Sequence, residues 1–182
     1  VERALQPYAS LQRGPLGVLI NARAQALVMP DASPASPTER AALERWIEAG
    51  GLLIRFAGPR LADQADQFTP VRLRPGSRTL GSALAWETPL GVGEFPIDSP
   101  YVGLNAPADV SVRRQVLAEP ASLQEARVWA ALSDNSPLVT AQPRGRGLIV
   151  LFHVSGGPDW STLPLSGLFV EMLRRTLAFA AR

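Results

Sequence analysis

The sequence has 182 residues, of which 46% are hydrophobic and 19% charged, a composition typical of one folded domain over residues 1–182 and unlike that of a disordered chain. Its net charge is only +2, and all its basic residues except one histidine are scattered arginines, so we expect no nucleic-acid partner. With no cysteine and a single histidine, disulfides, a thiol nucleophile and a multi-histidine zinc site are excluded, and we expect no metal or cofactor.

The first sixty residues predict two short helices, then a strand, a helix and a second strand. After a helix that opens the chain, a short helix follows within 15–24, and 25–31 forms a buried strand. In "SPTERAALERWIEAGG", Ser36 is placed to cap the next helix, with Pro37 in its first turn and Glu39 completing a capping box. The apolar run "GLLIRFAG" then predicts a strand covered on both faces.

The rest of the chain predicts insertions, more strands and a final helix. Residues 59–125 are rich in proline and glycine and contain short alternating pieces, which are typical of β-hairpin or extended insertions. The stretches "ARVWAAL", "PLVTAQP" and "LIVLFHV" predict an antiparallel run ending in a buried strand. The last helix has an apolar stripe made of Leu165, Leu168, Phe169, Met172 and Leu173.

A strand, a helix and a strand within about 30 residues form a βαβ unit, and its right-handed crossover makes the two strands parallel neighbours. We therefore expect an α/β fold, with a three-layer, mostly parallel sheet flanked by helices and carrying β-hairpin insertions. No stretch approaches the roughly 18 to 20 apolar residues that span a bilayer. The chain starts at Val1, without a methionine and in apparent mid-helix, so we expect a soluble fragment of a longer, membrane-anchored protein.

Ligands of open α/β sheets bind beyond the carboxyl ends of the strands, so three loops are candidates for a site. They follow "ALVMPD", "LLIRFAG" and "LIVLFHV". The candidate ligand-binding residues in these loops are Asp31, Gly58, Arg60, His153 and Asp159. Among them, Arg60 is the best candidate for holding an anionic group, because a guanidinium donates hydrogen bonds in a planar fork.

A serine hydrolase is the alternative from a different functional class. His153 would accept the proton of a nearby serine and would be oriented by Asp159 or Asp31. The serines in question are Ser155, Ser161 and Ser166. No G-x-S-x-G elbow follows a predicted strand, so a structural histidine bonded to neighbouring backbone is the simpler interpretation of His153.

Three stretches point to a known family: "ERAALERWIEAGGLLIRFAGPRLAD" (39–63), "RTLGSALAWE" and "GRGLIVLFHVSGGPDWSTLPLSGLFVEMLRR" (145–175). On these residues the chain resembles the class I glutamine amidotransferase-like superfamily. Within it, the chain resembles the domain found in large bacterial membrane proteins that also carry an aerotolerance-regulator-type membrane segment and the domain DUF4159. The resemblance implies an amidotransferase-like or flavodoxin-like arrangement of the sheet and its helices.

Active members of that superfamily place a nucleophilic cysteine on an elbow after a central strand, and a histidine, typically in "FHPE", after a late strand. In this chain Ala57, Gly58 or Pro59 stands at the elbow position. The late "FH" is present at 152–153 but is followed by Val154 and Ser155. Without a thiolate the glutaminase reaction has no first step, so the resemblance implies the scaffold of a catalytic site without its chemistry.

We therefore expect a noncatalytic domain that serves as a ligand-binding or protein-interaction module of a bacterial envelope protein. The hydrolase using His153 with a nearby serine is the alternative. The expected partners are other domains of the parent chain, envelope proteins or a small anionic ligand.

Overall fold

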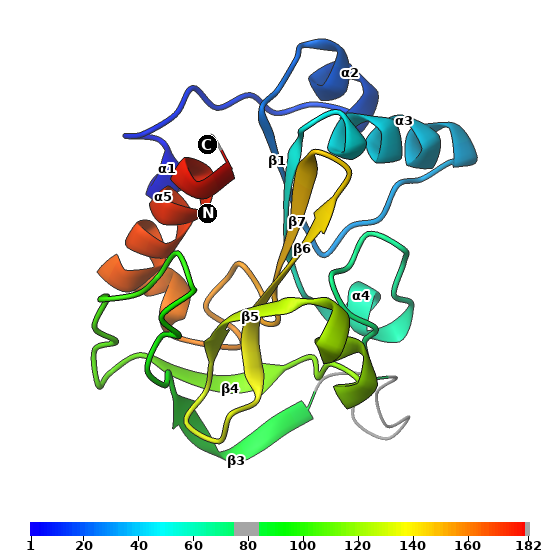
Figure 1. Ribbon diagram of the computed structural model, residues 1–182. Coiled ribbons are helices and arrows are strands. Elements are labelled where there is room, and N and C mark those ends of the chain that lie inside the picture. Colours follow the sequence, from blue (N-terminus) through cyan, green and yellow to red (C-terminus); the bar gives the residue numbers. More distant parts are fainter. Residues whose placement is uncertain (75–83, 181–182) are drawn as a thin grey trace.

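Five strands form one mixed sheet in the computed structural model, which describes residues 1–74 and 84–180 (Figure 1). In sheet order the strands are β1 (Ala26–Pro30), β2 (Leu52–Phe56), β7 (Gly147–Phe152), β6 (Pro137–Arg144) and β5 (Arg127–Ala131). β1, β2 and β7 run parallel, whereas β6 and β5 are antiparallel to their neighbours. The predicted α/β class and the antiparallel run are confirmed.

The sheet is mixed, and not mostly parallel as expected, because of the short connection between β6 and β7. Only Gly145 and Arg146 separate these two strands, and Gly145 has a positive φ of 58°. A two-residue turn joins antiparallel strands, since a parallel pair needs a crossover of a dozen or more residues. The parallel part of the sheet is therefore confined to three strands.

The predicted βαβ unit is confirmed as β1, α3 (Pro37–Glu48) and β2. Ser36 Oγ accepts a hydrogen bond from the Glu39 backbone N–H at 3.1 Å, as expected for the cap. The Glu39 carboxylate accepts from the backbone of Ala35, at 2.7 Å, and not from that of the cap residue itself. Gly50, with a φ of 119°, ends the helix in a conformation that side chains disfavour.

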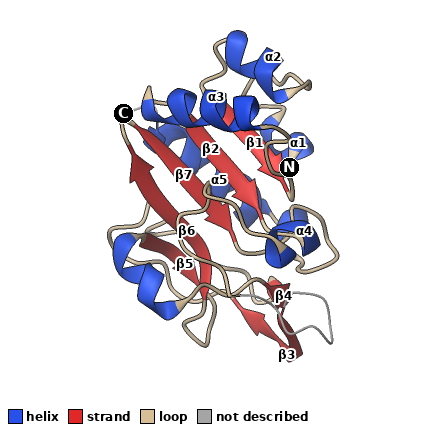
Figure 2. Cartoon of the chain, turned by 90° about the vertical axis from the view of Figure 1, so that its right-hand side faces the viewer, coloured by secondary structure: helices blue, strands red, loops and turns tan. Residues whose placement is uncertain are grey.

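Helices cover both faces of the sheet (Figure 2). Alternate residues of β2 and β7 point to opposite sides. One face packs against α1 (Glu2–Leu5) and α5 (Gly167–Ala180), through buried residues such as Ile54, Val150 and Phe169. The other packs against α2 (Leu16–Asn21) and α3, through residues such as Leu53 and Ile149. No helix among the described residues is long and apolar enough to cross a membrane.

The apolar stripe predicted for the last helix is buried in α5 except at its first member. Leu168, Phe169, Met172 and Leu173 are buried, and Thr176 joins them. Leu165 is 74% exposed because it precedes α5, in the short 3-10 helix η2 (Leu163–Leu165). The helical period thus holds only from Gly167 onward.

The predicted insertion forms a separate antiparallel pair, β3 (Leu84–Gly91) and β4 (Ser111–Gln115), beyond one end of the main sheet (Figure 1). The stretch "RTLGSALAWE" starts outside the described residues and enters β3 at Leu84. The insertion also contains α4 (Pro59–Asp63) and the 3-10 helix η1 (Pro120–Glu125). It therefore lies next to the loop that follows β2.

A buried arginine ties the loops that follow β1 and α4 together. Arg55, the last but one residue of β2, is fully buried, and its guanidinium pairs with the Asp66 carboxylate. The guanidinium also donates to the backbone oxygens of Phe68, at 3.1 Å, and Ala32. The strand predicted from its apolar residues thus also anchors the loops around the crevice described next.

Candidate functional site

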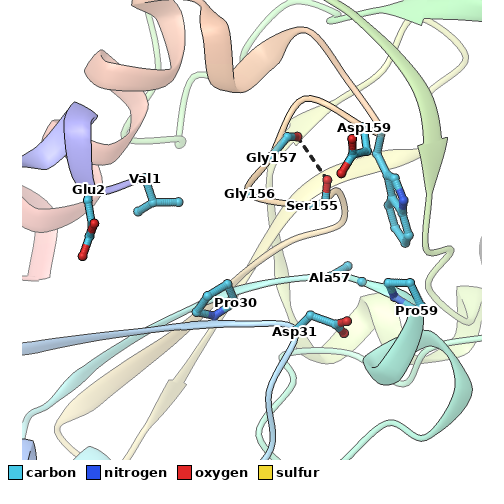
Figure 3. Close-up of a pocket in the computed structure, with 12 residues that line it drawn as sticks. Val1, Glu2, Pro30, Asp31, Ala57, Pro59, Ser155, Gly156, Gly157 and Asp159 are labelled. Carbon is cyan, nitrogen blue, oxygen red and sulfur yellow. Dashed lines mark hydrogen bonds between the residues drawn. The ribbon is translucent and has the colours of Figure 1, made fainter. Parts of the chain in front are cut away.

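A pocket of about 450 Å³ opens beyond the carboxyl ends of the three parallel strands (Figure 3). Its walls come from four segments of the chain: Val1–Glu2, the end of β1 at Pro30–Asp31, the turn after β2 at Ala57–Pro59, and the loop after β7. From that last loop, residues 155–157, Asp159 and Trp160 contribute. The position is the one expected for ligands of an open α/β sheet.

Asp31 stands at the end of β1 in a strained backbone conformation, with a φ of 40°. Its carboxylate accepts hydrogen bonds from two backbone N–H groups of α4, those of Leu61 at 2.9 Å and Arg60 at 3.2 Å. Asp31 therefore caps α4 from a different strand, because Gly58, at the cap position, has no side chain to do so. These bonds also fix the carboxylate at the edge of the pocket.

Gly58 is required by this arrangement. A Cβ atom at residue 58 would lie 2.2 Å from the Asp31 carboxyl carbon, a distance that real Cβ atoms do not reach. The constraint is one of space, since the φ of Gly58 is −168°, an extended value that any residue adopts. Gly58 thus lets the turn after β2 approach Asp31 closely.

The turn after β2 has the strand–turn–helix form that the resemblance implies for an elbow. β2 ends at Phe56, and α4 begins at Pro59, so Ala57 and Gly58 form the turn. Ala57, Gly58 and Pro59 all line the pocket, and none of them has a nucleophilic atom. The pocket therefore has no attacking group at this turn.

The loop after β7 forms the opposite wall. Ser155 Oγ donates to the backbone oxygen of Gly157 at 3.1 Å, which closes a tight turn. A Cβ atom at Gly156 would lie 3.1 Å from a methyl group of Val1, so this glycine lets α1 approach the loop. Asp159 and Asp31 lie on opposite sides of the pocket (Figure 3).

His153 lies outside the pocket and is fully buried. Its Nδ1 is 2.8 Å from the backbone oxygen of Val116, and its Nε2 is 2.9 Å from Thr140 Oγ1. Because a backbone oxygen only accepts, Nδ1 carries the proton and Nε2 accepts from the threonine hydroxyl. Burial lowers the pKa of His153 from 6.5 to about 4, so the ring is neutral near pH 7.

The serines of the hydrolase alternative are engaged elsewhere or enclosed. Ser155 binds Gly157, and Ser166 Oγ donates to the backbone oxygen of Leu163 at 2.7 Å. Ser161 Oγ is buried and has no hydrogen-bond partner in the described part of the chain. With both ring nitrogens of His153 bonded to Val116 and Thr140, the structure does not form the serine–histidine pair that the alternative requires.

Of the five predicted ligand residues, the structure brings three together. Asp31, Gly58 and Asp159 line the pocket, whereas Arg60 and His153 do not. Arg60 is exposed and reaches the site only through its backbone N–H, which binds Asp31. The pattern of strand ends located the crevice, but it does not show which way each side chain turns.

The side-chain charges on the pocket wall are negative. The carboxylates of Glu2, Asp31 and Asp159 line it, and none of the arginines in residues 1–74 and 84–180 does. Glu2 is paired with Arg13, whose hydrogen bond lowers the pKa of Glu2. Asp31 and Asp159 thus dominate the charge that a ligand meets. No group of three or more metal-binding side chains is found among the described residues.

Glu2 and Trp160 are among the wall residues that sequence reasoning missed. Glu2 reaches the pocket because α1 packs against α5, some 165 residues further along the chain, and no local pattern announces this contact. Trp160 is 5% exposed, as is typical of a tryptophan that packs in the core. Its position directly after Asp159 was the one available signal.

Comparison with solved structures finds related folds at low sequence identity. The cytoplasmic protein STM1381 of Salmonella typhimurium LT2 has a TM-score of 0.71 at 11% identity, over 98% of this chain and 84% of that one. The cytoplasmic protein STM3548 of Salmonella typhimurium gives 0.65 at 16% identity, over 93% and 76%. A putative ThuA-like protein of Bacteroides uniformis gives 0.53 at 16% identity, over 86% and 69%.

At these identities the likeness shows the α/β fold alone. No family model matches the chain, and no curated protein matches its sequence.

Proposed function

We propose that this chain is a noncatalytic domain of three-layer, amidotransferase-like design that binds a small molecule in the crevice at the ends of β1, β2 and β7. The observation that carries the proposal is the turn at 57–59. It has the strand–turn–helix form of a nucleophile elbow and opens into a pocket of about 450 Å³, yet it holds only alanine, glycine and proline. A pocket of this size is within the range of small-molecule sites.

His153 is also unable to act as a general base in the pocket. His153 follows the last parallel strand, as the resemblance implies, but it is enclosed and both its ring nitrogens are occupied. A general base must reach the proton that it removes, within about 3 Å or through one water. A histidine used for packing and a turn without a nucleophile together favour binding over turnover.

The charge of the wall favours a ligand that donates hydrogen bonds. An anion, which we expected Arg60 to hold, fits poorly, because the Arg60 side chain lies outside the pocket while Asp31 and Asp159 line it. Like charges repel strongly in a partly enclosed site. The ligand is therefore neutral or cationic.

A thermal-shift screen tests the binding proposal. The domain is heated with sugars, polyols, amines, nucleotides and small anions, and the same series is run on Gly157→Leu and Gly17→Leu. A Cβ atom at Gly157 meets only Asp159, at 3.9 Å, so leucine there occupies the pocket without a backbone clash. A Cβ atom at Gly17, in α2, meets nothing within 4 Å, which makes it the matched control.

A ligand at about ten times its Kd stabilises the folded state by about 1.4 kcal/mol and raises Tm by roughly 3–5 °C. We expect this shift in the unaltered domain and in Gly17→Leu, but not in Gly157→Leu. If no compound raises Tm, or if Gly157→Leu responds like the control, the crevice is not a ligand site. The domain would then act as a protein-interaction module.

The proposal includes a place for the domain in a larger protein. On the sequence resemblance alone, we propose that the parent is a membrane-anchored bacterial envelope protein whose other domains, or other envelope proteins, are partners of this one. Fractionation of cells that produce the full-length parent tests this part. Recovery of the parent in the membrane fraction, released by detergent and not by salt, is expected, and recovery in the soluble fraction contradicts it.

A further inference from the structure

One wall of the pocket is made by the first fifteen residues of the chain, which we call the strap. Val1 and Glu2 line the pocket on the side away from Asp31 and Pro59 (Figure 3). A methyl group of Val1 lies against the loop after β7, 3.1 Å from the place of a Cβ atom at Gly156. The strap therefore closes the crevice on one side without being part of the sheet.

Few buried side chains hold the strap in place. Leu5, at 3% exposed, is its only buried residue, and Val1 and Ala4 are partly buried against the same core cluster beside α5. Residues 6–15 are all exposed. A segment with so few buried apolar contacts opens at a lower free-energy cost than the core of its domain.

The backbone of the strap is also weakly held. α1 has only four residues, and a helix of this length is not stable without packing. Residues 10–14 form no backbone hydrogen bond with the rest of the chain that the structure describes. A hollow of about 300 Å³ lies within the strap, and its lining residues all belong to the strap: Glu2, Gln6, Ala9 and Leu11. The strap thus does not pack closely on itself.

One ion pair links the two ends of the strap. The Arg13 guanidinium pairs with the Glu2 carboxylate, and the Arg13 side chain is 83% exposed. An exposed pair of this kind adds little to stability. Leu5 is therefore the main anchor of the strap.

We infer that the strap is a movable wall of the pocket: Leu5 leaves its site beside α5, α1 unwinds, and the crevice opens on the side of Val1 and Glu2. A ligand that contacts Val1 or Glu2 binds the docked strap better than the undocked one, so it shifts the equilibrium towards the closed pocket. Because the pocket is the proposed ligand site, this inference rests on the proposed function, whereas the experiments that test it use no ligand.

Hydrogen exchange tests the movement. The amides of Leu5 and Gln6 donate within α1, to the backbone oxygens of Val1 at 3.2 Å and Glu2 at 2.8 Å, so they exchange when α1 unwinds. Relative to intrinsic rates, we expect them to exchange at least about a hundredfold faster than the amides of β2 and β7, which open with the whole fold.

Two substitutions show that this opening is local. Leu5→Ala removes the anchor and should speed the exchange of the α1 amides at least about tenfold further. Leu53→Ala, on the other face of the sheet, is the matched control. It should lower Tm and leave the exchange of the α1 amides unchanged.

Thiol labelling tests whether the movement opens the pocket. The chain has no cysteine, so Ser155→Cys places a single thiol in the pocket wall for reaction with the bulky, neutral pyrene maleimide. Leu5→Ala in this background should raise the labelling rate at least about tenfold. Ser133→Cys, in an exposed turn, is the control, and its labelling rate should not respond to Leu5→Ala.

A reversible crosslink holds the strap closed. Val1→Cys combined with Gly156→Cys joins positions at which a Val1 methyl group and a Cβ atom of residue 156 are 3.1 Å apart, close enough for a disulfide. Oxidation should slow the exchange of the Leu5 and Gln6 amides at least about tenfold, and reduction of the same sample should restore it. Circular dichroism melts confirm that each variant is folded.

The outcomes separate the movement of the strap from its effect on the pocket. Exchange of the α1 amides that is as slow as that of β2 and β7, or that the disulfide does not change, shows that the strap is fixed and overturns the inference. Fast exchange without faster labelling at residue 155 in the Leu5→Ala background overturns the opening of the pocket. Neither measurement depends on a ligand, so a negative thermal-shift screen and a fixed strap are distinguishable results.

Discussion

His153 and Val116 bind each other through two hydrogen bonds. The imidazole N–H donates to the backbone oxygen of Val116 at 2.8 Å, and the Val116 backbone N–H donates to the backbone oxygen of His153 at 2.9 Å. Val116 directly follows β4, and His153 directly follows β7. The only histidine of the chain thus joins the inserted segment to the central sheet.

Replacing His153 is expected to destabilise the fold. His153→Leu leaves the Val116 oxygen and the Thr140 hydroxyl buried without partners, at a cost of about 2–4 kcal/mol. Thr140→Val removes only one partner and should cost about 1 kcal/mol. Urea unfolding followed by circular dichroism measures both. Equal losses in the two variants would contradict the role given to the imidazole.

The same histidine predicts a pH dependence of stability. Its pKa is lowered by burial to about 4, from 6.5 in the unfolded chain. As the pH falls from 6.5 towards 4, the unfolded chain takes up a proton and the folded one does not, so stability is lost over this window, by about 3 kcal/mol in total. Above pH 6.5 the group is neutral in both states and adds no pH dependence.

The difference between two titrations isolates this effect. Unfolding free energies of the unaltered domain and of His153→Gln are measured from pH 4 to pH 8. Carboxylates titrate in both proteins, so their contribution cancels in the difference. The difference should change between pH 4 and 6.5 and be flat above that range; a flat difference throughout would show that the ring is not desolvated.

The contact between Gly58 and Asp31 predicts a coupled pair of substitutions. Gly58→Ala places a methyl group 2.2 Å from the Asp31 carboxyl carbon, and we expect a loss of about 1–3 kcal/mol from overpacking. In an Asp31→Gly background the obstacle is gone, so the same change should cost clearly less. A double-mutant cycle by urea unfolding measures the coupling. Additive effects would contradict the close approach.

A substitution of Gly147 should destabilise the fold more than one of Gly58, because the atoms that a Cβ would meet at Gly147 belong to the backbone. A Cβ atom at Gly147 would lie 2.0 Å from the backbone oxygen of Ile47 and 2.4 Å from that of Gly51. Gly147→Ala must therefore displace α3 or β7, and we expect a loss above about 2 kcal/mol. Gly91→Ala, where nothing lies within 4 Å, is the control and should change stability by less than about 1 kcal/mol.

The buried pair of Arg55 and Asp66 predicts a strong dependence on both partners. Arg55→Met preserves much of the side-chain volume but leaves Asp66 and two backbone oxygens without their donor, at a cost of about 3–5 kcal/mol. In an Asp66→Asn background the same substitution should cost less, since no unpaired charge remains. Unfolding in urea measures both costs, and equal costs would contradict the ion pair.

Local signals in the sequence predicted most of the elements. Ser36, Pro37 and Glu39 determine the start of α3, because capping depends on residues within one turn of each other. The apolar run before Ala57 predicted β2, and the stretches "PLVTAQP" and "LIVLFHV" predicted the antiparallel pair of β6 and β7. The assignment of Leu165 to the last helix was wrong, because the spacing of apolar residues does not show at which residue a helix begins.

Which residues form the pocket wall depends on the tertiary structure. The order of residues predicted a crevice at the strand ends and a turn without a nucleophile after β2, since strand ends and residue types can be read along the chain. Which side chains enter that crevice depends on contacts between distant segments, such as α1 with α5 and His153 with Val116. In the folded chain the side chain of His153 is buried outside the pocket and Trp160 lies at the pocket wall. The direction of each side chain follows from tertiary packing and not from the neighbouring residues in the sequence.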